Sequence, residues 1–255
     1  MKKYIQDFKV VRNKRLNADN YLLEIKCLEN LPEVFPGQFA EVLIENSRNV
    51  FLRRPFSIHD ADPDSNTLKL LIKRVGEGTR NLGYLEEGDF VNLVYPLGNY
   101  FSLPEGENAL LIGGGCGVAP LLYLARYLSE YQYFPTMLVG AKTANDILEA
   151  DEYQKYGNLL VATEDGSLGE KGLVTQHFEM HNIANYSKVY VCGPKPMMQA
   201  VAKMAADAGV ECEVSLENTM ACGIGACLCC VEETVHGNAC TCTDGPVFNL
   251  NDLKW

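Results

Sequence analysis

The fold of this chain is decided by the stretch Ala109-Leu-Leu-Ile112-Gly113-Gly-Gly115-Cys116-Gly117-Val-Ala-Pro120-Leu-Leu-Tyr-Leu-Ala-Arg-Tyr-Leu128. Its four leading apolar residues predict a short buried strand, and the glycines after them predict a tight turn. The apolar residues from Pro120 to Leu128 then predict a helix. A strand, a glycine-rich turn and a helix in this order are typical of a parallel α/β sheet.

The same alternation continues toward the C-terminus. The sequence predicts strands at 137–139, 159–163, 188–192 and 211–216, and helices near 144–156, 174–181 and 196–208. Strands that alternate with helices indicate a doubly wound parallel sheet.

The first hundred residues follow a different pattern. Short runs rich in Val, Ile, Leu, Phe and Tyr lie at 21–25, 39–44, 68–72 and 90–94, with Gly, Pro, Asn and Asp between them. Such spacing predicts an antiparallel barrel or sandwich. We therefore expect a β domain at 1–103, an α/β domain at 104–214 and a small cysteine-rich segment at 215–255.

Composition limits the classes of function. The chain has 255 residues, 47% of them hydrophobic, with 22 Lys and Arg against 33 Asp and Glu, which gives a net charge of -11. Nucleic acids require a basic face, so a nucleic-acid partner is not expected. The first residues lack the apolar run of an export signal, and no stretch reaches about 18 apolar residues. We expect no membrane span and a cytoplasmic location.

Ten cysteines are present, and six of them lie between 222 and 242. Cys222, Cys227 and Cys230 have the C-x4-C-x2-C spacing of a plant-type [2Fe-2S] site, which needs a fourth thiolate further along the chain. By spacing alone that ligand is Cys240 or Cys242. The competing prediction is a zinc site built from Cys227, Cys230, Cys240 and Cys242, which leaves Cys222 without a role.

Two further glycine motifs stand at predicted strand ends. Gly113, Gly115 and Gly117 open a helix and would let a phosphate approach its N-terminus, although Pro120 replaces the third glycine of the dinucleotide fingerprint. The alternative is an ordinary strand-to-helix turn. Cys192, Gly193 and Pro194 end a strand at the same sheet edge, and the alternative there is an ordinary buried cysteine. These residues do not decide between NAD and NADP.

Two cationic clusters lie in the β-rich half. One is Arg53-Arg54-Pro55-Phe56-Ser57, and the other runs from Lys73 to Thr79 and includes Gly78. Arg and Lys in an acidic protein indicate an anion site. Solvated side chains at a strand edge are the alternative.

Together these motifs resemble the ferredoxin-reductase-type flavoproteins over nearly the whole chain. Arg54 to Ser57 looks like that family's flavin motif, and Gly78-Thr79 like its pyrophosphate step. Gly113 to Pro120 looks like its nicotinamide-dinucleotide turn, and Cys192 to Pro194 like its Cys-Gly-Pro element. The C-terminal cysteines, ending in Cys242-Thr-Asp-Gly-Pro-Val-Phe248, resemble the electron transfer subunits of dihydroorotate dehydrogenase B.

The resemblance implies an FAD-binding β-barrel, an NAD-binding domain and one [2Fe-2S] cluster. It implies Cys242 as the fourth ligand after Cys222, Cys227 and Cys230. It also implies a partner, an FMN-containing dihydroorotate dehydrogenase catalytic subunit, in a heterotetramer with two copies of each chain. The implied FAD contacts are Arg54, Pro55, Phe56, Ser57, Leu71, Ile72, Lys73, Gly78 and Thr79, and the implied NAD contacts are Gly113, Gly115, Gly117, Cys192, Gly193 and Pro194.

The combination of cofactors has a chemical reason. NADH gives two electrons as a hydride and a [2Fe-2S] cluster passes one at a time, so a flavin is needed between them. The sequence offers no acid-base pair, Ser-His-Asp set or Walker loop, which places the substrate chemistry in the partner. The alternatives are a subunit of a bifurcating ferredoxin:NADP oxidoreductase or a sulfhydrogenase, or a non-catalytic zinc or thiol redox protein.

Overall fold

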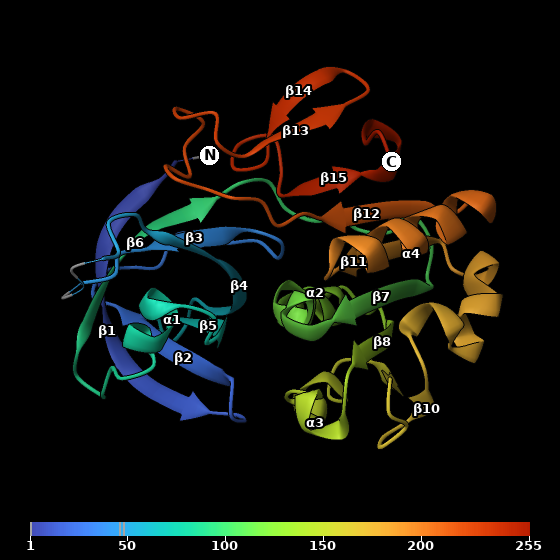
Figure 1. The fold of residues 1–255 in the computed structure, drawn as a ribbon, viewed down its shortest axis with the longest axis horizontal. Coiled ribbons are helices and arrows are strands. Elements are labelled where there is room, and N and C mark those ends of the chain that lie inside the picture. The colour runs from blue at the N-terminus through green and yellow to red at the C-terminus, as the bar shows by residue number, and fades with distance from the viewer. Residues whose placement is uncertain (1, 46, 48) are drawn as a thin grey trace. The chain divides into compact units, whose positions relative to one another are not determined.

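The computed structural model describes residues 2–45, 47 and 49–255, which form two compact units (Figure 1). Unit 1 holds the chain up to Tyr100 together with Glu217–Glu232 and Ala239–Pro246. Unit 2 holds Phe101–Leu216, Glu233–Asn238 and Val247–Trp255. The division of the chain into domains at 1–103, 104–214 and 215–255 stays a prediction.

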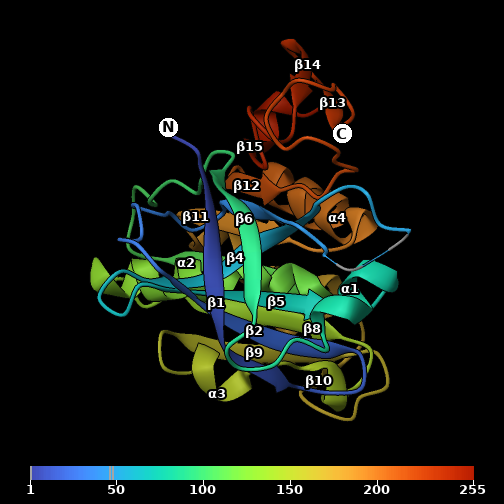
Figure 2. The ribbon, with the colours of Figure 1, turned by 90° about the vertical axis from the view of Figure 1, so that its left-hand side faces the viewer.

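Unit 1 is built on a closed antiparallel barrel with strand order β1-β2-β5-β4-β3-β6. Alternate residues of its strands point inward, where Phe8, Leu23, Ile58 and Tyr95 are fully buried. Closure between β1 and β6, which run side by side in Figure 2, leaves the barrel without an unpaired edge. The elements are β1 (Tyr4–Arg15), β2 (Asn20–Cys27), β3 (Phe39–Val42), β4 (Arg54–Asp62), β5 (Thr67–Lys73), α1 (Glu77–Leu82) and β6 (Phe90–Leu97).

Unit 2 is built on a seven-stranded sheet with order β10-β9-β8-β7-β11-β12-β15. All pairs from β10 to β12 are parallel, and β15 adds an antiparallel edge. The strands are β7 (Ala109–Gly114), β8 (Thr136–Ala141), β9 (Asn158–Thr163), β10 (Glu170–Lys171), β11 (Lys188–Cys192), β12 (Glu211–Ser215) and β15 (Val247–Asn249). The α-helices are α2 (Ala119–Glu130), α3 (Ala150–Tyr153) and α4 (Lys195–Asp207).

The tail contributes two more strands, β13 (Val231–Thr234) and β14 (Gly237–Cys240), which pair with each other. Short 3-10 helices occupy 115–118, 144–146, 174–176, 178–185 and 250–252. The predicted fold class is confirmed, since a β-barrel, a parallel α/β sheet and a C-terminal cysteine-rich segment are all present. Within the described residues, no helix has the length and apolarity that crossing a bilayer requires.

Two predicted helices were wrong in length. At 144–156 the structure has one 3-10 turn and the four-residue α3, because Thr143 donates to the Asp146 carboxylate and the Ala144 N–H donates to Ser167. At 174–181 the chain is extended at His177, whose ring nitrogen accepts the N–H of Glu179. In both places side-chain hydrogen bonds replace main-chain helix bonds.

A buried ion-pair network joins the first residues of β11 and β12. Lys188 is 1% exposed and its Nζ lies 2.9 Å from Glu211 Oε1 and 3.0 Å from Glu213 Oε1. The same ammonium donates to the Ser102 hydroxyl, which in turn donates to Glu213. The network ties Ser102, in the segment before β7, to the neighbouring strands β11 and β12.

Candidate cofactor sites

The predicted flavin motif begins strand β4. Residues 54–57 pair with β3, where Val42 opposes Arg54 and Phe39 opposes Ser57. All four motif residues are half-buried, so each keeps some accessible surface at the barrel wall. Their side chains are therefore available to a ligand that lies along this part of the barrel.

The structure brings the second cationic motif against the first. A methyl group at Gly78 would lie 3.3 Å from Ile44 Cγ1 and 3.7 Å from Arg54 Cγ, so the glycine permits close approach of these segments. The Thr79 hydroxyl accepts the N–H groups of Val75 at 2.9 Å and Gly76 at 3.0 Å, which fixes the turn before α1. Within β5, Leu71 and Ile72 are buried and Lys73 is exposed.

The dinucleotide turn uses its glycines in different ways. Gly113 pairs with Cys192 across β7 and β11, and its hydrogen faces Val118. Gly115 has φ +56° and no atom within 4 Å of where a side chain would start, so it is needed for the turn itself. Gly117 packs against the Cys-Gly-Pro element. A methyl group there would lie 2.4 Å from the carbonyl oxygen of Cys192 and from Gly193 Cα.

Gly117→Ala is therefore expected to push the turn away from Cys192 and Gly193. The clash is with main-chain atoms that cannot rotate away, so we expect a destabilisation of about 1–3 kcal/mol and a rise in the Kd for NADH of at least tenfold. Gly115→Ala meets no neighbour and should cost only the strain of its φ angle, about 1–2 kcal/mol. Thermal unfolding and NADH titration of both variants check this. Equal NADH affinity in Gly117→Ala and the unaltered protein would contradict it.

The cysteine loop lies in unit 1 and turns tightly at two glycines. Gly223 has φ +66° and Gly225 has φ +80°, conformations that favour glycine. The Gly225 N–H donates to Cys242 Sγ at 3.2 Å, and the Cys227 N–H donates to Cys222 Sγ at 3.4 Å. Backbone donors aimed at sulfur are what an iron-sulfur site requires.

The thiols differ in burial and in pKa. A hydrogen bond from the Ile224 N–H, together with further main-chain hydrogen bonds from the loop, lowers the pKa of Cys222 to about 6. Burial, with a hydrogen bond from the Cys242 thiol to Cys230, raises the pKa of Cys242 to about 12. Cys230 and Cys242 are buried and pack with Phe39 and Leu97. Thiols held this closely become thiolates together only when a cation binds between them.

Orphaned polar atoms near this loop also fit a bound group. Among the described residues, both carboxyl oxygens of Glu41 and the Thr241 hydroxyl are buried without a hydrogen-bond partner. Thr241 lies between Cys240 and Cys242, and Glu41 contacts the loop at Gly223. The donor set, four cysteine side chains of which two already accept main-chain N–H groups, suits an iron-sulfur cluster. Among the described residues, no three His, Cys, Asp or Glu side chains lie close enough together to hold a metal ion as they stand.

Cys229 and Cys240, the two cysteines of the loop region outside the proposed ligand set, differ in burial. Cys229 is exposed, whereas Cys240 is partly buried and packs at the margin of the group formed by Cys230 and Cys242. The main chain of Cys240 belongs to a turn, since its N–H donates to the Asp244 carboxylate and its carbonyl accepts the Asp244 N–H. Burial raises the pKa of Cys240.

Glu41 is the residue that sequence reasoning missed. The run Phe39-Ala-Glu-Val-Leu-Ile44 was predicted as a strand, and a carboxylate in the middle of an apolar strand is the signal that marks it. Burial raises the pKa of Glu41 to about 7, against the opposing effect of Arg53.

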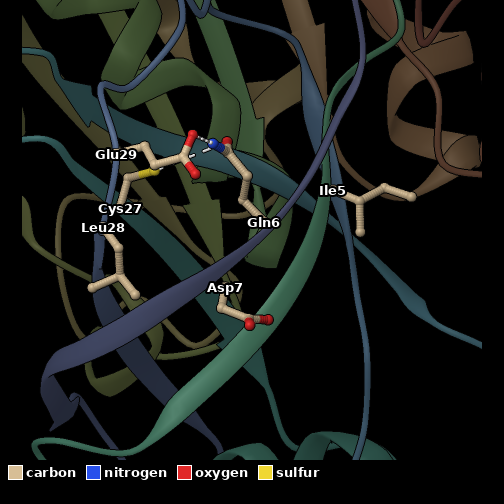
Figure 3. A pocket seen from close by; sticks show the side chains of 6 residues that line it. All are labelled: Ile5, Gln6, Asp7, Cys27, Leu28 and Glu29. Carbon is tan, nitrogen blue, oxygen red and sulfur yellow. Dashed lines mark hydrogen bonds between the residues drawn. The ribbon is translucent and has the colours of Figure 1, made fainter.

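A pocket of about 250 Å³ lies elsewhere on the barrel (Figure 3). Gln6 and Glu29 face each other across it, with Gln6 Nε2 donating to Glu29 Oε2 at 2.9 Å, and the Tyr95 hydroxyl donates to Gln6 Oε1. It is lined by Ile5, Gln6, Asp7, Cys27, Leu28 and Glu29, none of which is a predicted site residue.

Comparison with known proteins identifies the family. A family model described as the iron-sulfur cluster binding domain of dihydroorotate dehydrogenase B matches residues 217–254, and an oxidoreductase NAD-binding domain model matches 111–203. A dihydroorotate dehydrogenase B (NAD(+)) electron transfer subunit from Caldanaerobacter subterraneus subsp. tengcongensis is 38% identical over 244 residues, 94% of each chain. The chain belongs to this family of electron transfer subunits.

A second relative has the same description, and one solved structure has a similar fold. The electron transfer subunit from Fusobacterium nucleatum subsp. nucleatum is 35% identical over 98% of both chains. A solved NADH-dependent reduced ferredoxin-NADP oxidoreductase, a structure concerned with flavin-based electron bifurcation, matches with a TM-score of 0.87 and 30% identity over 97% of this chain and 90% of that one.

Family membership confirms the predicted class and cofactors. The chain is an NAD-linked oxidoreductase subunit whose cofactors are FAD, a [2Fe-2S] cluster and NAD. Which side chains contact each cofactor stays a prediction.

Proposed function

We propose that this chain passes electrons between NAD and the FMN of a dihydroorotate dehydrogenase catalytic subunit, in pyrimidine biosynthesis. The observation that supports it most is the loop of Cys222, Cys227 and Cys230 folded against Cys242, with main-chain N–H groups aimed at sulfur. Bound FAD supplies the exchange between hydride transfer and single-electron transfer.

The residues of the chain have separate tasks in this proposal. Arg54 to Ser57, Leu71 to Lys73, Gly78 and Thr79 hold FAD, and the Arg54 guanidinium compensates its phosphate charge. Gly113, Gly115 and Gly117 allow the dinucleotide phosphates to approach the start of α2, while Cys192, Gly193 and Pro194 shape the nicotinamide end. Cys222, Cys227, Cys230 and Cys242 ligate the cluster. In this proposal the partner subunit oxidises the substrate.

The cysteine loop also offers a surface for that partner. Ile224 and Leu228 are 48% and 64% exposed, and Cys227 beside them is exposed too. Apolar side chains on a loop that must come close to another cofactor favour a docking interface. We propose that this loop faces the catalytic subunit in a heterotetramer of two copies of each chain. Thiolate ligands require a reducing compartment, which favours the cytoplasm.

A second candidate has a specific observation behind it. The TM-score of 0.87 with the ferredoxin-NADP oxidoreductase structure favours a subunit of a bifurcating complex as the alternative. The two candidates differ in the partner that accepts or supplies single electrons.

The test is reconstitution with an FMN-containing dihydroorotate dehydrogenase subunit. We expect a stable complex that reduces NAD when dihydroorotate is added. Leu228→Asp should weaken the complex at least tenfold without changing the flavin and cluster spectrum, because it places a charge on the docking surface. Leu168→Asp, at an exposed leucine of unit 2, is the control. A complex that does not form, or electron delivery only to ferredoxin, would rule out this partner.

A further inference from the structure

Glu41 lies in the interior of the barrel strand β3 and has no partner there. It is 1% exposed, and among the described residues neither of its carboxyl oxygens makes a hydrogen bond. Burying a carboxyl group without a partner is costly, and such groups nearly always have one. Nothing in the packing of the barrel accounts for this side chain.

The nearby arginine does not satisfy the carboxyl group. Arg53 donates to the main-chain oxygens of Glu41 and Asn92 and to the Asn92 side chain. The guanidinium therefore holds the main chain of β3 and β6 together. The carboxyl oxygens of Glu41 are left for another group.

The cysteine loop is what lies against the carboxyl group. A methyl group at Gly223 would be 2.7 Å from Glu41 Cγ and 3.2 Å from Glu41 Oε1, so the loop residue directly after Cys222 packs on the carboxyl. Cys222, in turn, accepts a main-chain N–H from within the loop. The unpartnered oxygens of Glu41 thus lie against the loop whose cysteines are proposed to hold the cluster.

We propose that Glu41 sets the reduction potential of the cluster by donating a hydrogen bond from its neutral carboxyl group to sulfur on the Cys222 side. This inference rests on the proposed function, because it requires the cluster on these cysteines. Burial, the lack of a hydrogen-bond donor among the described residues and the negative charge of the thiolates in the adjacent loop favour the neutral form, against the opposing effect of Arg53 and Arg54. A donor to sulfur stabilises the reduced, more negative centre and raises its potential. Glu41 is a positioning residue that acts through the ligands.

Three variants separate the roles that the carboxyl group could have. Glu41→Leu removes the donor, and Glu41→Gln keeps a neutral donor of nearly the same shape. Glu24→Gln, on β2, which does not pair with β3, is the matched control for an acid removed elsewhere from the barrel. The reduction midpoint is measured by redox titration of the cluster's electron paramagnetic resonance signal, and iron and FAD contents are measured beside it.

We expect Glu41→Leu to shift the one-electron equilibrium at least fivefold toward the oxidised cluster, which is about 41 mV at 59 mV per tenfold change. Glu41→Gln and Glu24→Gln should shift it less than fivefold. Pulsed spectra of the reduced unaltered protein in H2O and D2O should show a strongly coupled exchangeable proton that Glu41→Gln alters.

The opposing results are distinct. A shift of the equilibrium by fivefold or more toward the reduced cluster in Glu41→Gln would mean that the native group is a charged carboxylate. A shift of less than fivefold in Glu41→Leu would mean that the side chain is only structural. Either result overturns the proposal. If Glu41→Leu does not hold iron, the Glu41→Gln midpoint and the proton coupling decide. Absence of the cluster signal from the unaltered protein would instead overturn the proposed function.

Discussion

Cys242→Ser is expected to remove the iron-sulfur centre, whereas Cys240→Ser is expected to leave it in place. Cys242 is fully buried, packs with Cys230 and accepts the Gly225 N–H at 3.2 Å. Cys240 lies at the margin, in a turn with Asp244. Removing a contact that supports a ligand already costs about 10–100-fold in metal affinity, and removing the ligand itself costs more. Iron and sulfide per FAD should therefore fall at least tenfold in Cys242→Ser alone.

Cys222→Ser separates the cluster from the zinc alternative. A cluster ligated by Cys222 loses its iron when this thiol is removed, while a zinc site made from Cys227, Cys230, Cys240 and Cys242 keeps its metal. Metal analysis of the purified variants checks both predictions. Equal iron loss from Cys240→Ser and Cys242→Ser would refute the choice of Cys242 as the fourth ligand.

Lys188→Ala is expected to lower the free energy of unfolding of unit 2 by about 3–5 kcal/mol, the usual cost of breaking one side of a buried ion pair. The alanine would leave Glu213, which is 8% exposed, and Glu211 without their cation, and the Ser102 hydroxyl without its donor. The penalty arises from the uncompensated buried charge and not from the attraction that is lost. Urea denaturation followed by circular dichroism measures it.

The control is an exposed ion pair on α4. Lys203 lies 2.9 Å from Asp207 one helical turn away, and both side chains are largely exposed. Lys203→Ala should cost only about 0.3–0.5 kcal/mol. Adding Glu213→Gln to Lys188→Ala should recover part of the loss, because it removes the unpaired charge. A cost for Lys188→Ala as small as that of the control would contradict the role given to the network.

Local patterns were the features that sequence predicted well. The strand at Lys188–Cys192 has its predicted limits, and the strand, glycine turn and helix from Ala109 lie where the glycines and leucines indicate. The helices at 144–156 and 174–181 were overestimated, because apolar periodicity does not register the side-chain bonds of Thr143 and His177. The short helix α1 was missed, since six residues are too few to establish a period.

Long-range contacts were the features that sequence could not supply. The cysteine spacing predicts a cluster from residues close in the chain, whereas the place of Glu41 depends on β3 meeting a loop almost at the other end of the sequence. In the same way, the division of the tail between the two units follows from tertiary packing and has no local signal. The contact of Gly117 with Cys192 depends on the pairing of β7 and β11.

The most direct test of the electron-transfer role is the visible absorption of anaerobically purified protein before and after NADH is added. The cofactors of this family predict flavin bands overlapping iron-sulfur absorption, with both bleached by NADH. A colourless protein that contains zinc, or a spectrum that NADH does not change, would contradict the assignment of an NAD-linked flavin and iron-sulfur subunit.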